Sequence, residues 1–107
     1  MELNVEVIRV RSGNHQSSSL KSLIRESVRT AQLESGEGVI KFYTNKLIAG
    51  DYMVCLYWDK PVDEKQGSTV GRKLKIELEA HGLINHSLWI EQDVIDKQAT
   101  TKAIKES

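Results

Sequence analysis

The middle of the chain contains the continuous apolar run Tyr52-Met53-Val54-Cys55-Leu56-Tyr57-Trp58. Its residues are apolar or aromatic on both parities, that is, at the odd and at the even positions, which face opposite sides of a strand. Aromatic and β-branched residues favour strands. A strand that is apolar on both faces belongs in the middle of a sheet, with something covering each side. We therefore predict a central strand over residues 52–58.

A second extended run lies immediately before this strand. Val39–Ile48 is rich in β-forming residues, and Ala49-Gly50-Asp51 separates it from the central run. Two extended runs joined by a short turn that contains glycine predict an antiparallel hairpin. We therefore expect residues 39–48 to pair directly with the central strand.

Two further strands are predicted outside this hairpin. Residues 3–11 alternate in polarity, as is typical of a half-buried strand. In residues 83–94, apolar residues recur at alternate positions, which predicts the last strand. The apolar side of the first strand consists of Leu3, Val5 and Val7, and its polar side begins with Asn4 and Glu6.

Two amphipathic helices are predicted between the strands. The first follows the candidate N-caps Ser17-Ser18-Ser19 and ends before Gly36. Its apolar residues recur at three- and four-residue spacing; they are Leu20, Leu23, Ile24, Val28 and Ala31. The second helix begins after Ser68 and closes at His81-Gly82. Residues 59–67, which contain the only proline, predict a solvated loop.

The order strand, helix, strand, strand, helix, strand is that of the ferredoxin-like βαββαβ fold, an α+β fold. It predicts a four-stranded antiparallel sheet with both helices on one face, and right-handed crossovers put the first and third strands in the middle. The chain of 107 residues is expected to form one domain over residues 1–95, followed by a polar C-terminal tail over residues 96–107.

The face of the sheet away from the helices is expected to be apolar. Met53, Cys55 and Tyr57 are predicted to lie on it, and we expect Ile8, Val10 and Trp89 nearby. A cluster of this kind usually marks an interface, so we predict a homodimer formed through the open sheet face. The alternative is that some of these residues lie at the rim of the sheet and need no partner.

Composition argues against several classes of partner. Fifteen basic and fifteen acidic residues give a net charge of zero, so no overall field attracts a nucleic acid, and no polybasic run suggests a membrane surface. No apolar run approaches the roughly 18 residues of a membrane span. The lone cysteine and the absence of a signal-peptide pattern at the start lead us to expect a cytoplasmic protein.

In its element order, its length and the residues Leu56-Tyr57-Trp58-Asp59, the chain resembles the dimeric α+β barrel proteins over residues 1–95. Within them it is most similar to the antibiotic-biosynthesis-monooxygenase-like group. The resemblance implies a homodimer that binds a small organic molecule, with a cofactorless monooxygenase as the implied enzyme. Haem-degrading members use an asparagine and a tryptophan, which Asn4 and Trp58 match, together with a helix histidine. His81 comes too late in its helix for that role, so we expect no haem and no other cofactor.

Four residues are candidates for a catalytic site in a pocket between the helices and the sheet. Trp58 and Asn4 would hold the substrate, and Tyr57 or His86 would transfer a proton. Each has a plainer alternative. Trp58 and Tyr57 are equally explained as packing residues, Asn4 as a polar residue at the end of the sheet, and His86 as a half-exposed strand histidine.

A non-enzymatic alternative is a dimeric interaction or anion-sensing module. The start of the second helix combines hydroxyls, glycine and two cations, a composition that favours a bound phosphate or carboxylate; the residues are Ser68, Thr69, Gly71, Arg72 and Lys73. A capped helix with a solvated basic turn explains the same residues. No grouping with metal-ligand spacing is present, so no metal site is predicted.

Overall fold

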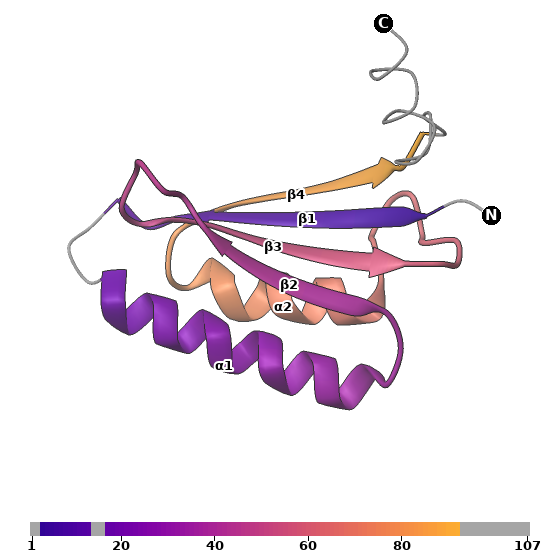
Figure 1. The fold of residues 1–107 in the computed structure, drawn as a ribbon, viewed down its shortest axis with the longest axis horizontal. Helices are drawn as coiled ribbons and strands as arrows, with labels where there is room; N and C mark the ends of the chain where they lie inside the picture. Colours follow the sequence, from indigo (N-terminus) through magenta and orange to yellow (C-terminus); the bar gives the residue numbers. More distant parts are fainter. Residues whose placement is uncertain (1–2, 14–16, 93–107) are drawn as a thin grey trace, which may run out of the picture.

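Four strands and two helices follow one another in the predicted order (Figure 1). The computed structural model describes residues 3–13 and 17–92. The strands are β1 (Asn4–Arg11), β2 (Val39–Thr44), β3 (Asp51–Trp58) and β4 (Leu83–Ile90), and the helices are α1 (Ser17–Ser35) and α2 (Thr69–Glu79). The strands form one antiparallel sheet in the order β2-β3-β1-β4. Both helices cover the same face, which confirms the ferredoxin-like α+β fold.

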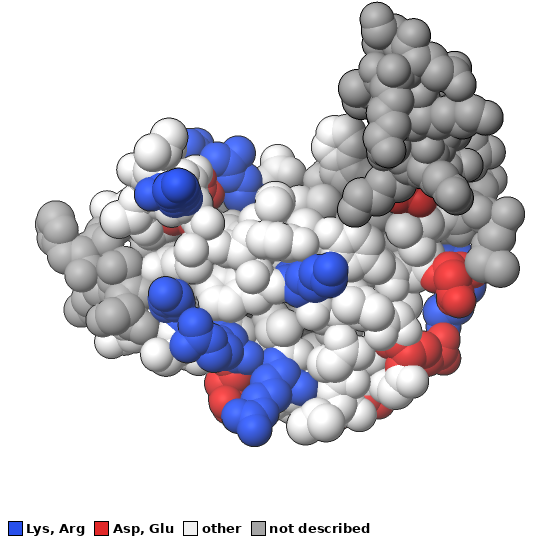
Figure 2. Space-filling model, viewed as in Figure 1, with Lys and Arg blue, Asp and Glu red and all other residues white. Residues whose placement is uncertain are grey.

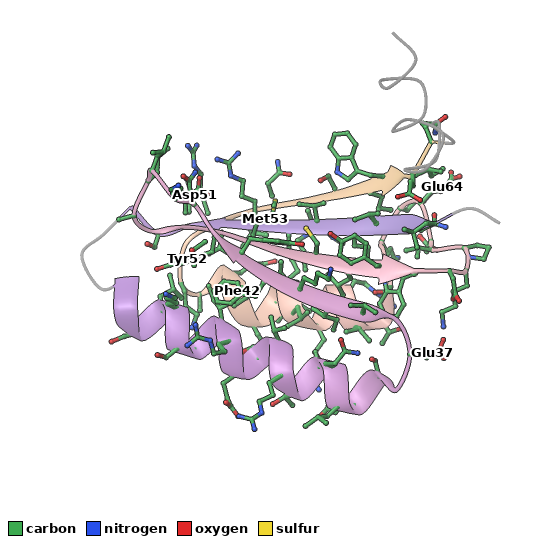
Figure 3. The ribbon with its side chains drawn as sticks, in the orientation of Figure 1. Glu37, Phe42, Asp51, Tyr52, Met53 and Glu64 are labelled. Atoms are coloured by element: carbon green, nitrogen blue, oxygen red, sulfur yellow. The ribbon has the colours of Figure 1, made fainter. Side chains whose placement is uncertain are left out.

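The core lies between the helices and one parity of the central strands. In β3 this parity is Tyr52, Val54, Leu56 and Trp58, all buried, and it meets the apolar stripes of the two helices. Figure 3 shows Phe42 and Tyr52 on the helix side of the sheet, with ring centroids 5.9 Å apart, and Met53 on the opposite side. Each large apolar side chain buried in this way contributes about 1.5–3 kcal/mol to folding.

Ile8 and Val10 were predicted near the open face, and that prediction is wrong. Ile8 pairs with Val54 and Val10 with Tyr52, so both lie on the helix side, where neither has any exposed surface. The other set of alternate residues in this segment begins with the apolar Leu3, Val5 and Val7, which suggested that it was the buried set. It continues, however, into Arg9 and Arg11. The helix-facing side of β1 therefore begins with two polar residues, Asn4 and Glu6.

The turn between β2 and β3 is longer than predicted. Strand β2 ends at Thr44 rather than at Ile48, because the side chain of Asn45 organises the loop. Its Oδ1 accepts hydrogen bonds from the backbone N–H groups of Leu47 and Ile48, at 2.8 and 3.0 Å. Those two apolar residues therefore lie exposed on a loop instead of extending the strand.

The helix ends differ from the prediction in detail. Ser68 is the N-cap of α2, as predicted, and its Oγ accepts a hydrogen bond from the N–H of Gly71 at 2.9 Å. Helix α2 ends at Glu79, before His81. Strand β4 ends at Ile90 rather than Val94, and the predicted tail over residues 96–107 lies outside the described residues. Of the helices in the described chain, none is long and apolar enough to cross a membrane.

A side chain of α1 covers part of the free edge of β2. The amide of Gln32 donates to the backbone oxygen of Gly38 at 3.1 Å. Its Oε1 accepts from the backbone N–H of Ile40 at 2.7 Å. Helix α1 is thereby tied to the start of the edge strand.

An ion pair joins the C-terminal part of β1 to the start of β3, which lie side by side in the antiparallel sheet. Both carboxylate oxygens of Asp51 accept from the guanidinium of Arg9, at 3.0 and 2.7 Å, and Asn45 donates to the same carboxylate at 2.9 Å. The hydrogen bonds from Arg9 outweigh the effect of burial and hold the pKa of Asp51 at about 2, against an ordinary 3.8. Asp51 is therefore more acidic in the folded chain than in the unfolded chain.

Replacing Asp51 with asparagine is predicted to reduce stability at neutral pH but not in strong acid. Because the folded pKa is depressed, the stabilisation is complete above about pH 5 and is lost as the pH falls through about 2. Urea unfolding should therefore show a lower midpoint for Asp51→Asn at pH 7, and the difference should shrink as the pH is lowered. Glu79→Gln on the surface of α2 is the charge-matched control. A midpoint difference that does not change with pH would contradict this account.

Candidate functional site

A buried carboxylate lies where β1, β3, β4 and the start of α2 meet. Glu6 has no exposed surface, although burying a carboxylate is costly unless its oxygens are hydrogen-bonded. Its Oε1 accepts from Nε1 of Trp58 at 2.6 Å. Its Oε2 accepts from the backbone N–H of Ser68 at 3.1 Å and lies 2.9 Å from Nε2 of His86. Three segments far apart in sequence thus supply the polar partners of one side chain.

Two glycines make room for this carboxylate. A Cβ added at Gly71 would collide with the carboxylate of Glu6, and a Cβ at Gly67 would collide with Glu6 and with the ring of His86. Gly67 also has a positive φ of 77°, which disfavours any other residue there. The α2 N-terminus can therefore approach β1 closely only because both positions are glycine.

The candidate site residues from the sequence are brought together only in part. Trp58 and His86 meet at Glu6, and both point into the helix side of the sheet. Asn4 lies beyond them, and its amide donates to the backbone oxygen of Lys60 at 3.1 Å. His81 lies past α2, beside the Arg11 end of the sheet, and so does not approach Asn4 and Trp58.

Tyr57 is separated from the other three candidates by the sheet itself. Successive residues of a strand point to opposite faces, so Tyr57 lies on the open face while Trp58 lies on the helix face. Its hydroxyl lies 3.4 Å from that of Tyr43, and this hydrogen bond, followed by burial, raises the pKa of Tyr57 above its ordinary value. Tyr57 therefore cannot share a proton with His86.

Four of the five residues predicted to bind an anion already have partners within the chain; they are Ser68, Gly71, Arg72 and Lys73. The N–H of Ser68 donates to Glu6, and Oγ of Ser68 is used to cap the N–H of Gly71. Arg72 donates to Oε1 of Gln66 at 2.7 Å, and Lys73 pairs with Glu34 at 3.0 Å. The anion nearest to this helix start is thus the protein's own carboxylate. Residues 3–13 and 17–92 contain no grouping of acidic, histidine and cysteine residues suited to a metal ion.

A cavity of about 650 Å³ opens beside Asn4, at the end of the sheet where β1 begins and β4 ends. We call it the sheet-end cavity. The β3–α2 loop forms its other side, and its wall combines apolar and polar residues; they are Asn4, Asp59, Lys60, Pro61, Val62, Glu64, Leu88, Trp89 and Ile90. The predicted pocket between the helices and the sheet is occupied instead by core side chains and by Glu6.

Glu6 and the sheet-end cavity were both missed from the sequence. The basic residues Arg9 and Arg11 could have shown that the parity of Glu6, Ile8 and Val10 is the buried one. A second signal was the pair of glycines on either side of the N-cap Ser68. The cavity left no comparable signal, because its loop has the composition of an ordinary solvated loop.

Gly71→Ala is predicted to destabilise the protein by about 1–3 kcal/mol, because the new methyl group collides with the Glu6 carboxylate. The sign is informative, since alanine in place of a helix glycine normally stabilises by about 0.5–1 kcal/mol. Chemical unfolding of the single variants and of Glu6→Ala/Gly71→Ala completes a double-mutant cycle. The penalty should disappear when Glu6 is alanine. An equal penalty in both backgrounds would show that the collision is elsewhere.

The ferredoxin-like arrangement alone does not indicate what a protein does, because function resides in sites placed on a fold. Comparison of the chain with known proteins finds no matching family model, curated protein or solved structure. The cavity, contacts and charges of the chain itself are therefore the basis for its function.

Proposed function

We propose that the chain is a binding protein for a small organic molecule, which occupies the sheet-end cavity. The observation that carries the proposal is the cavity itself. Its volume of about 650 Å³ falls within the range of about 300–1,000 Å³ usual for ligand pockets. Its wall offers an apolar surface from Val62, Leu88 and Ile90 beside the polar groups of Asn4 and Asp59. Ligand sites typically have this combination, in which apolar area gives affinity and a few polar groups give orientation.

Binding is favoured over catalysis by the positions of the four candidate residues. Of these, only Asn4 belongs to the cavity wall. Trp58 is buried with its indole N–H bound to Glu6, and His86 is held by the same carboxylate. Tyr57 is on the opposite face of the sheet. The cofactorless oxygenase implied by the resemblance would need these groups around one substrate, so we assign a ligand and no reaction.

The binding proposal is tested with 3-phenylpropanol, a neutral probe with an apolar ring and one hydroxyl. A ligand of about ten heavy atoms at roughly 0.3–0.5 kcal/mol per atom should bind in the millimolar range. In ¹H–¹⁵N spectra, titration should shift the amides of Asn4, Val62 and Leu88. Ile90→Trp, which adds bulk to the wall, should weaken binding about tenfold or more. Leu83→Trp, at the other end of β4, is the matched control and should bind as the wild type does. Shifts that map outside the wall would contradict the proposal.

We also propose that the protein is a homodimer that associates through the open sheet face. On this face the neighbouring strands present apolar and aromatic side chains beside one another; these are Val5, Val7, Val39, Tyr43, Met53, Cys55, Tyr57 and Trp89. Cys55, at its centre, is already buried, and burial raises the pKa of its thiol. No helix or strand of residues 3–13 and 17–92 covers this face (Figure 1). A second copy of the chain would present the same apolar face, and two copies related by a two-fold axis would bury these faces against each other.

Val5→Glu is predicted to convert the dimer to a monomer, because the new carboxylate would lie between Tyr57 and Trp89 on the apolar face, with no basic residue opposite it on β3 or β4. Sedimentation velocity should give a dimer for the wild type and a species of 12.1 kDa for the variant. Leu33→Glu replaces an apolar residue of α1 that is 78% exposed and should remain a dimer. A wild-type protein that sediments as a monomer at micromolar concentrations would rule the interface out.

A further inference from the structure

Of the charged groups around the sheet-end cavity, the basic one has an ion-pair partner and the two acidic ones do not. The ammonium of Lys60 lies 2.7 Å from Oε2 of Glu37, a residue outside the wall, and 5.7 Å from the ring centroid of Trp58. Its charge is therefore compensated by the protein. The carboxylates of Asp59 and Glu64 have no hydrogen bond or ion pair with any group in the described part of the chain. The wall thus has two unpaired negative charges and no unpaired positive one.

The neutral polar side chains of the wall use their nitrogens in hydrogen bonds within the protein. The amide nitrogen of Asn4 uses one of its two N–H groups to donate to the backbone oxygen of Lys60, and its Oδ1 makes no hydrogen bond with the described part of the chain. The indole N–H of Trp89 donates to Oγ of Ser87 at 2.8 Å. With Lys60 bound to Glu37, each side-chain nitrogen of the wall makes one hydrogen bond within the protein. The polar side-chain atoms of the wall that make no hydrogen bond with the described part of the chain are therefore oxygens, of Asn4, Asp59 and Glu64.

Acidic side chains occur at the end of the molecule that carries the sheet-end cavity. Figure 3 places Glu64 beside the end of β4 and Glu37 below it, after α1. Figure 2 shows acidic side chains along the same edge, with basic atoms between them, and this edge carries the β3–α2 loop. The apolar part of the wall lies next to these acceptors, and it consists of Pro61, Val62, Leu88, Trp89 and Ile90. A ligand for this wall must bring hydrogen-bond donors, positive charge and an apolar body.

From this arrangement we propose that the ligand of the sheet-end cavity is a protonated amine with an apolar or aromatic body. The inference rests on the proposed function and gives it a chemical class. An ammonium group supplies three donors and a charge that matches Asp59 and Glu64, and Oδ1 of Asn4 is a further acceptor. A carboxylate or phosphate ligand would instead meet the like charges of Asp59 and Glu64.

A matched series of three probes separates the charge from the apolar body. 3-Phenylpropylamine, 3-phenylpropanol and 3-phenylpropionate differ in a single terminal group, which is cationic, neutral or anionic at pH 7. We expect the amine to bind about fivefold more tightly than the alcohol, the size expected for partly exposed charge pairs, and the carboxylate to bind most weakly. Affinities are measured from the shifts of the wall amides during titration.

Charge-neutral variants identify the groups responsible. Asp59→Asn/Glu64→Gln keeps the shape of both side chains and should remove the preference for the amine over the alcohol. Glu26→Gln/Glu79→Gln changes the net charge equally on the exposed surfaces of α1 and α2, and it should keep the preference. Unfolding curves of both double variants check that each remains folded.

The possible outcomes separate the two proposals. Equal binding of amine and alcohol by the wild type would overturn the charge inference while leaving the cavity as a ligand site. A preference that survives in Asp59→Asn/Glu64→Gln, or stronger binding of the carboxylate, would also overturn it. If none of the three probes shifts the wall amides, the binding function itself fails.

Discussion

The buried carboxylate of Glu6 connects four elements of this structure. A carboxylate removed from water is stable only when its oxygens are hydrogen-bonded, and here the partners come from Trp58, Ser68 and His86. Those partners belong to β3, the start of α2 and β4, so satisfying one side chain fixes the positions of three elements on β1. The glycines at 67 and 71 follow from the same requirement, since a larger residue at either position would displace the carboxylate.

The fold was predictable from the sequence because its signals are redundant. The run over residues 52–58 is apolar on both parities, which makes β3 central, and the helices show clear stripes on either side of it. The sequence marks Trp58, Ser68 and His86 as candidate site residues, but it does not show that they are connected. The connection runs through Glu6, which alternation assigned to the polar side of β1. Burial of a charged residue depends on partners distant in sequence, and a pattern of local polarity does not contain that information.

The two faces of β3 serve different purposes. The parity of Tyr52 to Trp58 builds the core, and the parity of Met53 to Tyr57 faces away from both helices. Two residues that are adjacent in sequence therefore lie in different environments, as Tyr57 and Trp58 demonstrate. Trp89 belongs to the open face by its register and also borders the sheet-end cavity. The cavity consequently adjoins the surface through which we propose that two chains meet.

The side chain of Gln32 gives β2 a property that its sequence does not reveal. A glutamine amide has one acceptor and a donor group, as a peptide unit does, and Gln32 uses them on the backbone of Gly38 and Ile40. These are backbone groups that an added strand would use to extend the sheet. Helix α1 therefore supplies a short imitation of a fifth strand. Extension of the sheet by a further strand is therefore blocked at the start of this edge.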